Sequence, residues 1–289
     1  MKSPFPANAA GGLLAADLDG TLAFGGIIGP GIRRAADRAR AAGIPILVVT
    51  GRNPRSIDRV EGIWDVADEI LFSSGAGVLR GPDALPEEHF GEEGARLTAA
   101  DVERIAAVLD GHGEDYFLLD PIPGNHRFAW HRNRPSGENP DFDARMDLYG
   151  GWGRAYGGSA APACQVLAVL PPAGAPAAAP ADLPALEADL SAWSVFRSSS
   201  PIDHASIWLE VFPAGTDKGA ALAAWCAAYG IAADRVLALG NDFNDVPMLE
   251  WAGRGRVVPD APAALRDNYA VRNFAEAVEE ALEAFGGAG

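Results

Sequence analysis

Lysine is nearly absent from this sequence. The 289 residues include 23 basic ones, and only Lys2 and Lys218 are lysine, so every other basic residue is arginine. Lysine carries a compact ammonium charge and arginine a planar fork of donors, and the two do not replace each other at a tight polar site. A chain that otherwise uses arginine therefore indicates a special role for Lys218. The alternative is a solvated lysine on the first turn of a helix.

Cysteine and long apolar runs are also scarce. The two cysteines, Cys164 and Cys226, lie far apart, which excludes a disulfide framework and a cysteine metal site. Cys226 lies in an alanine-rich helical pattern and is expected to pack in the core. No apolar run is long enough to span a membrane, and none ahead of Asp17 is long enough for a secretion signal. We expect a cytoplasmic protein that does not enter a membrane.

Positive charge is in deficit. The formal net charge is -16, which argues against a nucleic-acid partner, because such a partner calls for a basic face. Any anionic ligand must instead be held by positive charge gathered locally. The apolar and charged fractions, 48% and 21%, are those of a globular protein, and the length suits one large or two ordinary domains.

Two carboxylates stand one residue apart directly after an apolar run. Asp17 and Asp19 follow residues 13–16, and residues i and i+2 of a strand point to the same side, so both side chains could share one site. Gly20 allows a sharp turn and Thr21 adds a hydroxyl. Paired carboxylates at the end of a buried strand are costly unless they bind a metal or do chemistry. The plainer alternative is an Asp-Gly turn that closes a strand.

Three further apolar strands are each followed by polar residues, which is where ligands bind in open parallel α/β sheets. These strands and the residues that follow them are 46–49 with Thr50-Gly51-Arg52, 207–212 with Thr216-Asp217-Lys218-Gly219, and 236–239 with Gly240-Asn241-Asp242-Phe243-Asn244-Asp245.

In this order the four segments resemble the motifs of the haloacid dehalogenase superfamily. The Thr-Gly-Arg form and the position of the insertion look most like the Cof-type sugar-phosphate phosphatases, over roughly residues 12–80 and 205–289. The resemblance implies an α/β fold with a Rossmann-like parallel-sheet core, formed by 1–80 and 205–289. Residues 81–204 would form an inserted α+β domain, the C2-type cap.

The hydrophobic pattern predicts the following elements. In the core we expect strands at 13–18, 44–49, 69–73, 207–212, 235–239 and 256–258, and helices at 31–42, 54–61, 217–229, 245–252 and 274–285, with Thr216 as a helix cap. In the insertion we expect strands at 116–119, 127–131, 166–170 and 194–197, helices near 99–110, 141–148 and 182–192, and an exposed loop over 171–184.

The resemblance also implies roles for individual residues. Asp17 would attack phosphorus as a nucleophile, and Asp19 would act as general acid and base. Repulsion between a carboxylate and a phosphate calls for Mg²⁺. The phosphate and substrate would contact Thr50, Gly51, Arg52, Lys218 and Asn244, and the metal ligands would come from Asp17, the Asp19 main chain, Asn241, Asp242 and Asp245. Arg52 could equally be a salt-bridge partner at a helix start.

The chain departs from the family pattern twice. Asn241 stands where the first Asp of the fourth motif is expected and Asp242 follows it, so either could ligate the metal; we favour Asp242 together with Asp245. Residues 73–76, Ser-Ser-Gly-Ala, replace the usual Asn-Gly-Ala, and Ser74 could take over the polar contact of that Asn.

These features predict a Mg²⁺-dependent phosphomonoester hydrolase that acts on a small phosphorylated metabolite, with a sugar phosphate as the favoured substrate. A phosphomutase or phosphotransferase would use the same residues, and a non-catalytic phosphometabolite-binding protein is the third hypothesis. The segments Gly124–Arg127 and His131–Arg134 form either a specificity surface or a solvated strand edge. The sequence leaves the oligomeric state open.

Overall fold

The computed structural model describes residues 11–89, 96–172, 182–200, 202–203 and 205–286. The chain divides into two units, one formed by Met1–Phe90 and Asp217–Gly289 and the other by Gly91–Thr216. These divisions lie about ten residues after the expected ones at 80/81 and 204/205. The first lies later because the strand at 87–88 pairs with the first sheet, and the second because the strand at 207–212 pairs with the second sheet.

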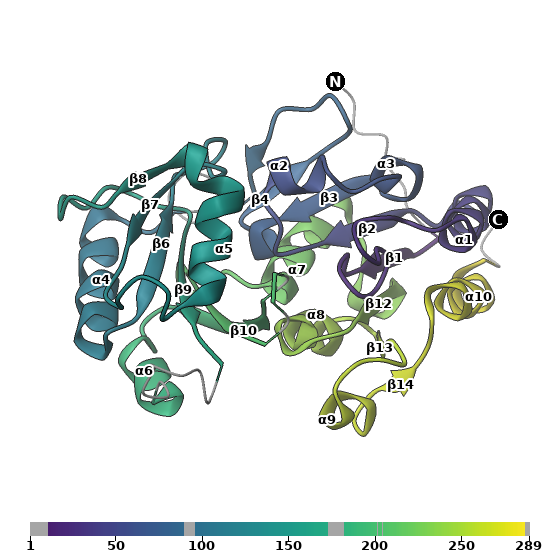
Figure 1. Cartoon of the computed structure of the whole chain (residues 1–289). Helices are drawn as coiled ribbons and strands as arrows, with labels where there is room; N and C mark the ends of the chain where they lie inside the picture. The colour runs from purple at the N-terminus through teal and green to yellow at the C-terminus, as the bar shows by residue number, and fades with distance from the viewer. Residues whose placement is uncertain (1–10, 90–95, 173–181, 201, 204, 287–289) are drawn as a thin grey trace. The chain divides into compact units, whose positions relative to one another are not determined.

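The first unit is built on an eight-stranded sheet in the order β14-β13-β12-β1-β2-β3-β4-β5 (Figure 1). Pairing is parallel from β14 to β3, and β4 and β5 are added antiparallel. The three central strands are completely buried, as expected for a parallel sheet covered on both faces. The strands are β1 Leu13–Ala16, β2 Ile46–Val49, β3 Glu69–Phe72, β4 Gly77–Leu79, β5 Glu87–Glu88, β12 Val236–Gly240, β13 Arg254–Val257 and β14 Ala270–Val271.

The helices of the first unit pack in two groups: α1 contacts α3 and α10, and α7 contacts α8. An ion pair between Arg38 and Glu279 links α1 to α10. The α-helices are α1 Pro30–Ala41, α2 Pro54–Ile57, α3 Ile63–Val66, α7 Lys218–Tyr229, α8 Val246–Trp251, α9 Ala263–Arg266 and α10 Phe274–Phe285, and the short 3₁₀ turns are η1 Ser73–Gly75, η3 Ala233–Arg235 and η4 Phe243–Asp245.

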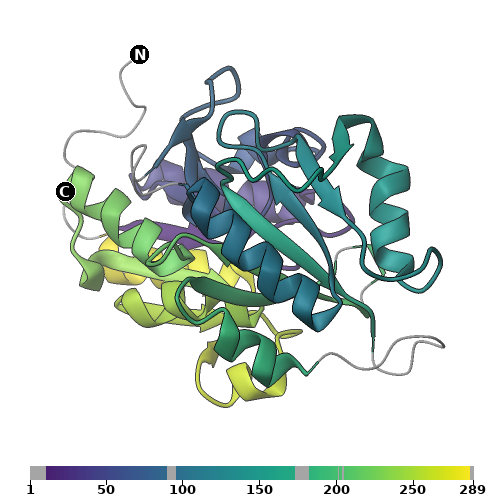
Figure 2. The same ribbon diagram turned by 90° about the vertical axis from the view of Figure 1, so that its left-hand side faces the viewer.

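The second unit has a six-stranded sheet in the order β10-β11-β9-β6-β7-β8, antiparallel except for β7 with β8. Its helix α4 lies against one face of this sheet (Figure 2), where Val102, Ile105 and Leu109 pack on Val166 and Ala168. The elements are α4 Ala99–His112, β6 Asp115–Leu119, β7 Phe128–His131, α5 Pro140–Tyr149, η2 Gly150–Trp152, β8 Gly153–Ala155, β9 Gln165–Leu170, α6 Leu183–Asp189, β10 Ser194–Ser199 and β11 Ile207–Phe212.

The placement of β11 corrects the sequence prediction. The apolar run at 207–212 is a strand, but it pairs antiparallel with β9 and β10 in the second sheet rather than with the parallel strands. The prediction was wrong because a run of apolar residues reveals a strand and not its partner. The core strand expected ahead of Lys218 therefore does not exist, and Lys218 is placed by the start of α7.

Smaller differences also have local causes. The helix expected over 54–61 ends at Ile57, and residues 58–60 form a turn; the next helix, α3, begins after Gly62, outside the expected range. The N-cap of α7 is Asp217, whose side chain accepts from the backbone N–H of Ala220 at 2.6 Å, and not Thr216. Strands β4, β5, β8 and β14 were not predicted, since two or three residues carry no periodicity. Most of the loop expected over 171–184 lies outside the described residues.

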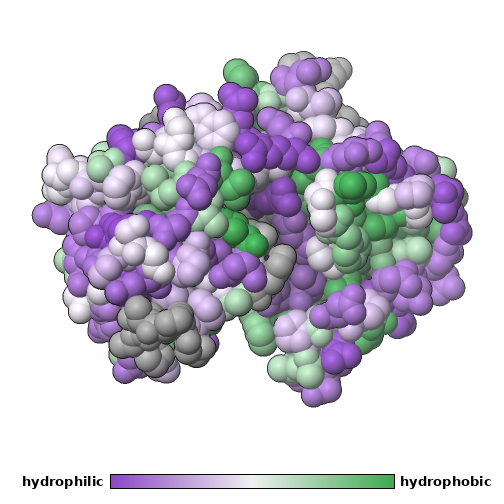
Figure 3. Space-filling model, viewed as in Figure 1, coloured by the Kyte–Doolittle hydropathy of each residue, from purple (hydrophilic) through white to green (hydrophobic). Residues whose placement is uncertain are grey.

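The surface in view in Figure 3 is mostly hydrophilic, with hydrophobic residues scattered among polar ones. Among the described residues, no helix combines the length and apolar character needed to cross a membrane. In the part of the chain that the structure describes, the exposed large hydrophobic side chains are Phe24, Ile27, Leu85, Leu148, Trp152 and Phe243.

Candidate active site

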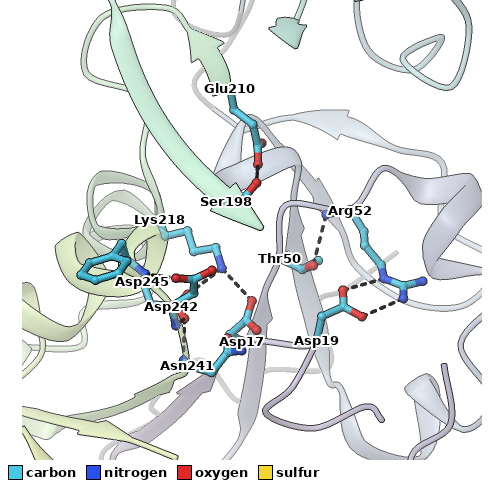
Figure 4. A network of polar contacts seen from close by, with 11 residues as sticks. Asp17, Asp19, Thr50, Arg52, Ser198, Glu210, Lys218, Asn241, Asp242 and Asp245 are labelled. Carbon is cyan, nitrogen blue, oxygen red and sulfur yellow. Dashed lines mark hydrogen bonds and ion pairs between the residues drawn. The ribbon is translucent and has the colours of Figure 1, made fainter. Parts of the chain in front are cut away.

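Adjacent parallel strands deliver the first polar groups of the site. Strands β12, β1 and β2 are neighbours, so their carboxyl ends meet at one edge of the sheet. Asn241 follows β12, Asp17 follows β1 and Thr50 follows β2 (Figure 4). The backbone N–H of Asp17 still donates to Leu239 O at 2.9 Å, which fixes Asp17 to the end of the ladder.

Lys218 completes the centre of the site from the first residue of α7. Its Nζ lies 2.6 Å from Asp17 Oδ1 and 2.6 Å from Asp245 Oδ1, and the side chain is 1% exposed. The helix reaches this position because Gly219 has no side chain: a Cβ there would lie 2.4 Å from Pro247 O at the start of α8. A buried ammonium group thus bridges two buried carboxylates.

Burial and charge act together on these groups. Burial raises the pKa of Asp17 to about 7; the Lys218 ammonium opposes this shift, and the nearby Asp245 and Asp19 carboxylates add to it. Burial alone would lower the pKa of Lys218, but attraction to Asp17 and Asp245 outweighs it and the pKa is raised. Lys218 therefore stays an ammonium ion, and Asp17 sits where added positive charge favours its ionised form.

Asp245 has all of its accepting capacity directed inward. Its Oδ1 binds Lys218, and its Oδ2 accepts from the backbone N–H groups of Asn241 at 2.7 Å and Asp242 at 3.1 Å. The side chain is completely buried against Gly240, where a Cβ would lie 2.6 Å from Asp245 Oδ2. Asp245 thus orients Lys218 and folds the 240–245 loop.

The side chains of Asn241 and Asp242 have different surroundings. A Cβ on Gly20, which has a φ of 77°, would lie 2.5 Å from Asn241 Nδ2, so the Asn241 amide is packed against the loop that carries Asp17 and Asp19. Asp242 Oδ1 accepts from the backbone N–H of Phe243 at 2.7 Å and caps η4. Our preference for Asp242 is therefore not favoured by the geometry, which brings the Asn241 side chain to the Asp17 loop. Asn244 lies within η4, half-buried.

Asp19 is held by Arg52. Arg52 Nε and Nη2 lie 2.7 Å from Asp19 Oδ2 and Oδ1, respectively, and Nη1 donates to Ser56 O at 2.8 Å. The Asp19 side chain is 46% exposed and that of Arg52 24% exposed. Arg52 therefore forms a salt bridge with Asp19, and its contact with a phosphate or substrate stays a prediction.

Thr50 presents a free hydroxyl hydrogen. Its Oγ1 accepts from the backbone N–H of Arg52 at 3.2 Å, which leaves the O–H able to donate elsewhere. The Thr50 and Arg52 carbonyls in turn accept from the backbone N–H groups of Ser74 and Ser73, each at 2.9 Å. Gly51 lies between them in a bend. The Thr50–Arg52 loop is thereby fixed from both sides.

The oxygen atoms of this site suit a hard cation, although they do not come from a cluster of carboxylates. Among the described residues, no three His, Cys, Asp or Glu side chains are grouped so that they could hold a metal ion. Arg52 occupies both carboxylate oxygens of Asp19, and Asp245 is bound to Lys218 and to two backbone N–H groups. Oxygen from Asp17, the amide of Asn241 and the main chain remains, and Mg²⁺ accepts such ligands together with water. The residues present fit the ion with a single direct carboxylate.

The chain is similar to one protein family model and to several solved structures. Residues 186–271 match the family model described as haloacid dehalogenase-like hydrolase. Similar solved structures include a haloacid dehalogenase-like hydrolase from Bacteroides thetaiotaomicron, with 20% identity, a TM-score of 0.65 and coverage of 93% of this chain and 98% of that chain. A second is a phosphatase of the superfamily from the same organism, with 20% identity, a TM-score of 0.66 and coverage of 95% of both chains. A third is a subclass IIB sugar phosphatase, with 16% identity, a TM-score of 0.69 and coverage of 95% and 99%.

The chain has the haloacid dehalogenase fold. No curated protein matches it significantly. The resemblance stated from the sequence is confirmed, together with the α/β class, the parallel core sheet and a mostly antiparallel inserted sheet.

Two features of this site were missed from the sequence. One is the Asp19–Arg52 pair, which joins residues 33 positions apart and leaves no periodic signal. The other is the turn at Ser73 and Ser74, whose φ values of 50° and 53° place two non-glycine residues in the left-handed region. The hydroxyl of Ser74 is buried without a hydrogen-bond partner among the described residues. The departure from Asn-Gly-Ala was the available signal, since Asn is favoured in that region.

The basic cluster of the second unit is engaged locally. His131 lies 3.4 Å from Asp110 and stacks on Tyr116 at 5.2 Å. Arg132 pairs with Asp143, and Arg134 pairs with Glu114 at 2.6 Å. These partners agree with the strand-edge alternative, and a role in specificity stays a prediction.

Proposed function

We propose that this chain is a Mg²⁺-dependent phosphomonoester hydrolase that works through an aspartyl-phosphate on Asp17. The observation that carries the proposal is the buried Lys218 ammonium, which lies 2.6 Å from both Asp17 and Asp245. Asp17 is a buried carboxylate with one oxygen bound to a lysine and the other without a donor among the described residues, so it is placed to attack an electrophile. A purely structural ion pair does not need to lie at the carboxyl ends of the strands, beside the Thr50 hydroxyl.

The chemistry divides into two displacements. A carboxylate oxygen of Asp17 bonds to phosphorus while the bond from phosphorus to the ester oxygen breaks, and the Asp19 carboxyl gives its proton to the leaving oxygen. Water then attacks phosphorus, Asp19 takes the water proton, and the bond between phosphorus and Asp17 breaks. The products are an alcohol and inorganic phosphate, with Asp17 and Asp19 restored.

Two donors of the chain would stabilise charge on the transferring group. Lys218 already contacts Asp17 and would neutralise charge shared between Asp17 and the phosphoryl oxygens. The Thr50 hydroxyl has an unused hydrogen, because its oxygen accepts from Arg52 N. Both groups are at least 98% buried, so each acts in a medium where electrostatic interactions are strong.

Mg²⁺ would be held by Asp17, the amide oxygen of Asn241 and the main-chain carbonyl of Asp19. When bound, the ion reduces the repulsion between the Asp17 carboxylate and the phosphate. Asn241 is assigned rather than Asp242 because its amide is packed against Gly20, whereas Asp242 caps η4. Asp245 keeps Lys218 and the loop in place.

The substrate is proposed to be a small phosphorylated metabolite of the sugar-phosphate class. Support comes from the similar structures, one of which is described as a sugar phosphatase. The unit formed by residues 91–216 is proposed to select the leaving group, as a cap does, because the predicted catalytic residues all lie outside it.

The test is phosphate release from an aryl phosphate and from a panel of sugar and nucleotide monophosphates, with and without Mg²⁺. A hydrolase releases inorganic phosphate from several of them only with the metal, and D17N releases none. A phosphomutase would convert one sugar phosphate into another with little net release. A binding protein would show saturable binding of sugar phosphates without turnover in any condition.

A further inference from the structure

The Asp19–Arg52 pair has a geometry that the proposed chemistry does not require. Both carboxylate oxygens of Asp19 are taken by one guanidinium, through Nε and Nη2 at 2.7 Å each. This two-pronged arrangement fixes the direction of the carboxylate plane as well as its distance, which a lysine could not do. Asp19 is thereby oriented before any substrate is present.

Arg52 is itself held at three points. Its Nη1 donates to Ser56 O at 2.8 Å, its backbone N–H donates to Thr50 Oγ1 at 3.2 Å, and its carbonyl accepts from the backbone N–H of Ser73 at 2.9 Å. The guanidinium cannot swing freely, because its third nitrogen is bound to the first turn of α2. A side chain fixed in this way can serve as a reference position for Asp19.

The pair is also exchangeable. The side chains are 46% and 24% exposed, and ion pairs that are open to solvent contribute little net free energy. Asp19 can give up one of its two bonds to Arg52 when a leaving oxygen arrives and still be oriented by the other. A buried pair of the Lys218 kind would not release a partner so easily.

We infer that Arg52 is a positioning residue for Asp19: it orients the carboxyl group that protonates the leaving oxygen and later accepts the water proton. The inference rests on the proposed function, since it assigns Arg52 to the acid–base group rather than to the phosphate. It differs from a phosphate-binding role in one consequence. Loss of orientation at Asp19 harms substrates whose leaving groups need a proton, whereas loss of a phosphate contact harms all substrates alike.

The experiment compares kcat/KM for an alkyl phosphate, such as glycerol phosphate, with that for p-nitrophenyl phosphate in wild type, R52Q and R52K. The matched control is R55Q, because Arg55 is an exposed arginine on α2 and the substitution removes the same charge three residues further along the chain. kcat/KM reports the steps up to transfer of the phosphoryl group, so later hydrolysis does not obscure the comparison. Inhibition by inorganic phosphate is measured for each variant.

We expect R52Q to lower kcat/KM for the alkyl phosphate on the order of 10- to 100-fold, part of what general acid catalysis contributes. The aryl phosphate should lose less than about threefold, because its leaving group needs little protonation. R52K should be intermediate, R55Q should resemble wild type, and the inhibition constant of phosphate should not change. In a D19N background, R52Q should have no further effect, since the two residues then act as one unit.

Three outcomes would overturn the inference. Equal losses for both substrates with weaker phosphate inhibition would place Arg52 on the phosphate. Unchanged rates in R52Q would make the pair incidental. Full additivity with D19N would separate the two residues. Each of these requires an active wild type, so they leave the proposed function standing, whereas a wild type inactive toward every phosphate ester would remove both.

Discussion

The two units bury acidic groups at similar depth and use them differently. In the second unit, Asp115 is completely buried and accepts from the backbone N–H groups of Asn133 at 2.8 Å and Arg134 at 2.9 Å, and from Asn139 Nδ2 at 2.9 Å. Every donor lies within about 25 residues of Asp115 in the sequence. The carboxylate stabilises a local loop, and both of its oxygens accept hydrogen bonds from it.

In the first unit, the Asp17 carboxylate has a single donor among the described residues, Lys218, which lies 201 positions away in the sequence. Its neighbours at the strand ends, Thr50 and Asn241, also keep polar atoms that no described contact uses. The difference teaches that burial of a carboxylate does not identify a functional site. Unused hydrogen-bonding capacity that converges from distant segments does, because a scaffold carboxylate must be satisfied and a reacting one must not be.

Glu69 shows the same distinction inside the first unit. It is completely buried on β3 and accepts from Trp225 Nε1 at 2.9 Å, Arg80 Nη1 at 3.1 Å and the Tyr229 hydroxyl at 3.1 Å. These contacts tie α7 to the sheet. Glu69 therefore resembles Asp115 and not Asp17, although it shares a sheet with Asp17.

The largest expected effect comes from making the same substitution in both units. D17N should lower turnover by about 10⁴-fold or more, because an amide is a poor nucleophile. Its free energy of unfolding should change little, since the amide oxygen can still accept from Lys218. D115N should leave turnover per folded molecule unchanged and lower the free energy of unfolding by about 1–3 kcal/mol, because an amide N–H then faces the Asn139 donor. Phosphate release and urea unfolding measure the two effects; the opposite pattern would contradict the comparison.

The second prediction concerns Lys218. K218M removes the charge between Asp17 and Asp245 and should lower kcat by about 10²–10³-fold. It should also lower the free energy of unfolding by about 3–5 kcal/mol, because two buried carboxylates are left unpaired. The double variant K218M/D245N removes one of the two unpaired carboxylates and with it their mutual repulsion. It should regain stability without regaining activity. Recovery of activity in the double variant would assign Lys218 a purely structural role.

Much of this site could be predicted from the sequence because four short segments carry it. Asp17, Thr50 and the 241–245 loop follow apolar strands that are read easily, and parallel pairing brings their ends together. The helix at Lys218 was also predicted, but its preceding strand was assigned to the wrong sheet, since the pairing of 207–212 depends on residues 165–170 and 194–199. The fold class could be predicted because the alternation of strands and helices is a local signal in the sequence. The sheet to which the strand at 207–212 belongs could not, because strand order is not a local signal.

The choice between Asn241 and Asp242 could not be made from the sequence. The choice depends on which of the two side chains lies against Gly20. A shift of the loop by one residue would exchange Asn241 and Asp242 there. The pairing of Arg52 with Asp19 was likewise hidden, because it depends on how α2 leaves the sheet.

The third prediction tests the metal assignment, which gives the site one fewer carboxylate than the family pattern. N241D should bind Mg²⁺ about tenfold more tightly, because ligand charge sets affinity for hard cations. D242A should leave Mg²⁺ affinity unchanged and lower the free energy of unfolding by about 1 kcal/mol through loss of the η4 cap. The measurement is the melting temperature as a function of Mg²⁺ concentration, which requires no substrate. Loss of the Mg²⁺ response in D242A alone would reverse the assignment.

The smallest expected effect concerns a titratable group that belongs to the scaffold of the first unit. His89 Nε2 lies 2.9 Å from Ala221 O, so the neutral ring donates there. Burial lowers the pKa of His89; the contact with Ala221 opposes this shift, and the Arg80 charge adds to it. Below about pH 6.5, the unperturbed pKa of histidine, the unfolded chain binds a proton that the folded ring resists. The contribution of His89 to stability is therefore present above that pH and is lost as the pH falls toward the lowered pKa of the folded state.

The variant H89Q can keep a donor toward Ala221 but cannot titrate. The free energy of unfolding of wild type should therefore fall relative to that of H89Q as the pH is lowered from 7.5 to 5.5. Urea unfolding across this range measures the difference, and a constant difference would show that His89 is as free to take a proton in the folded chain as in the unfolded one.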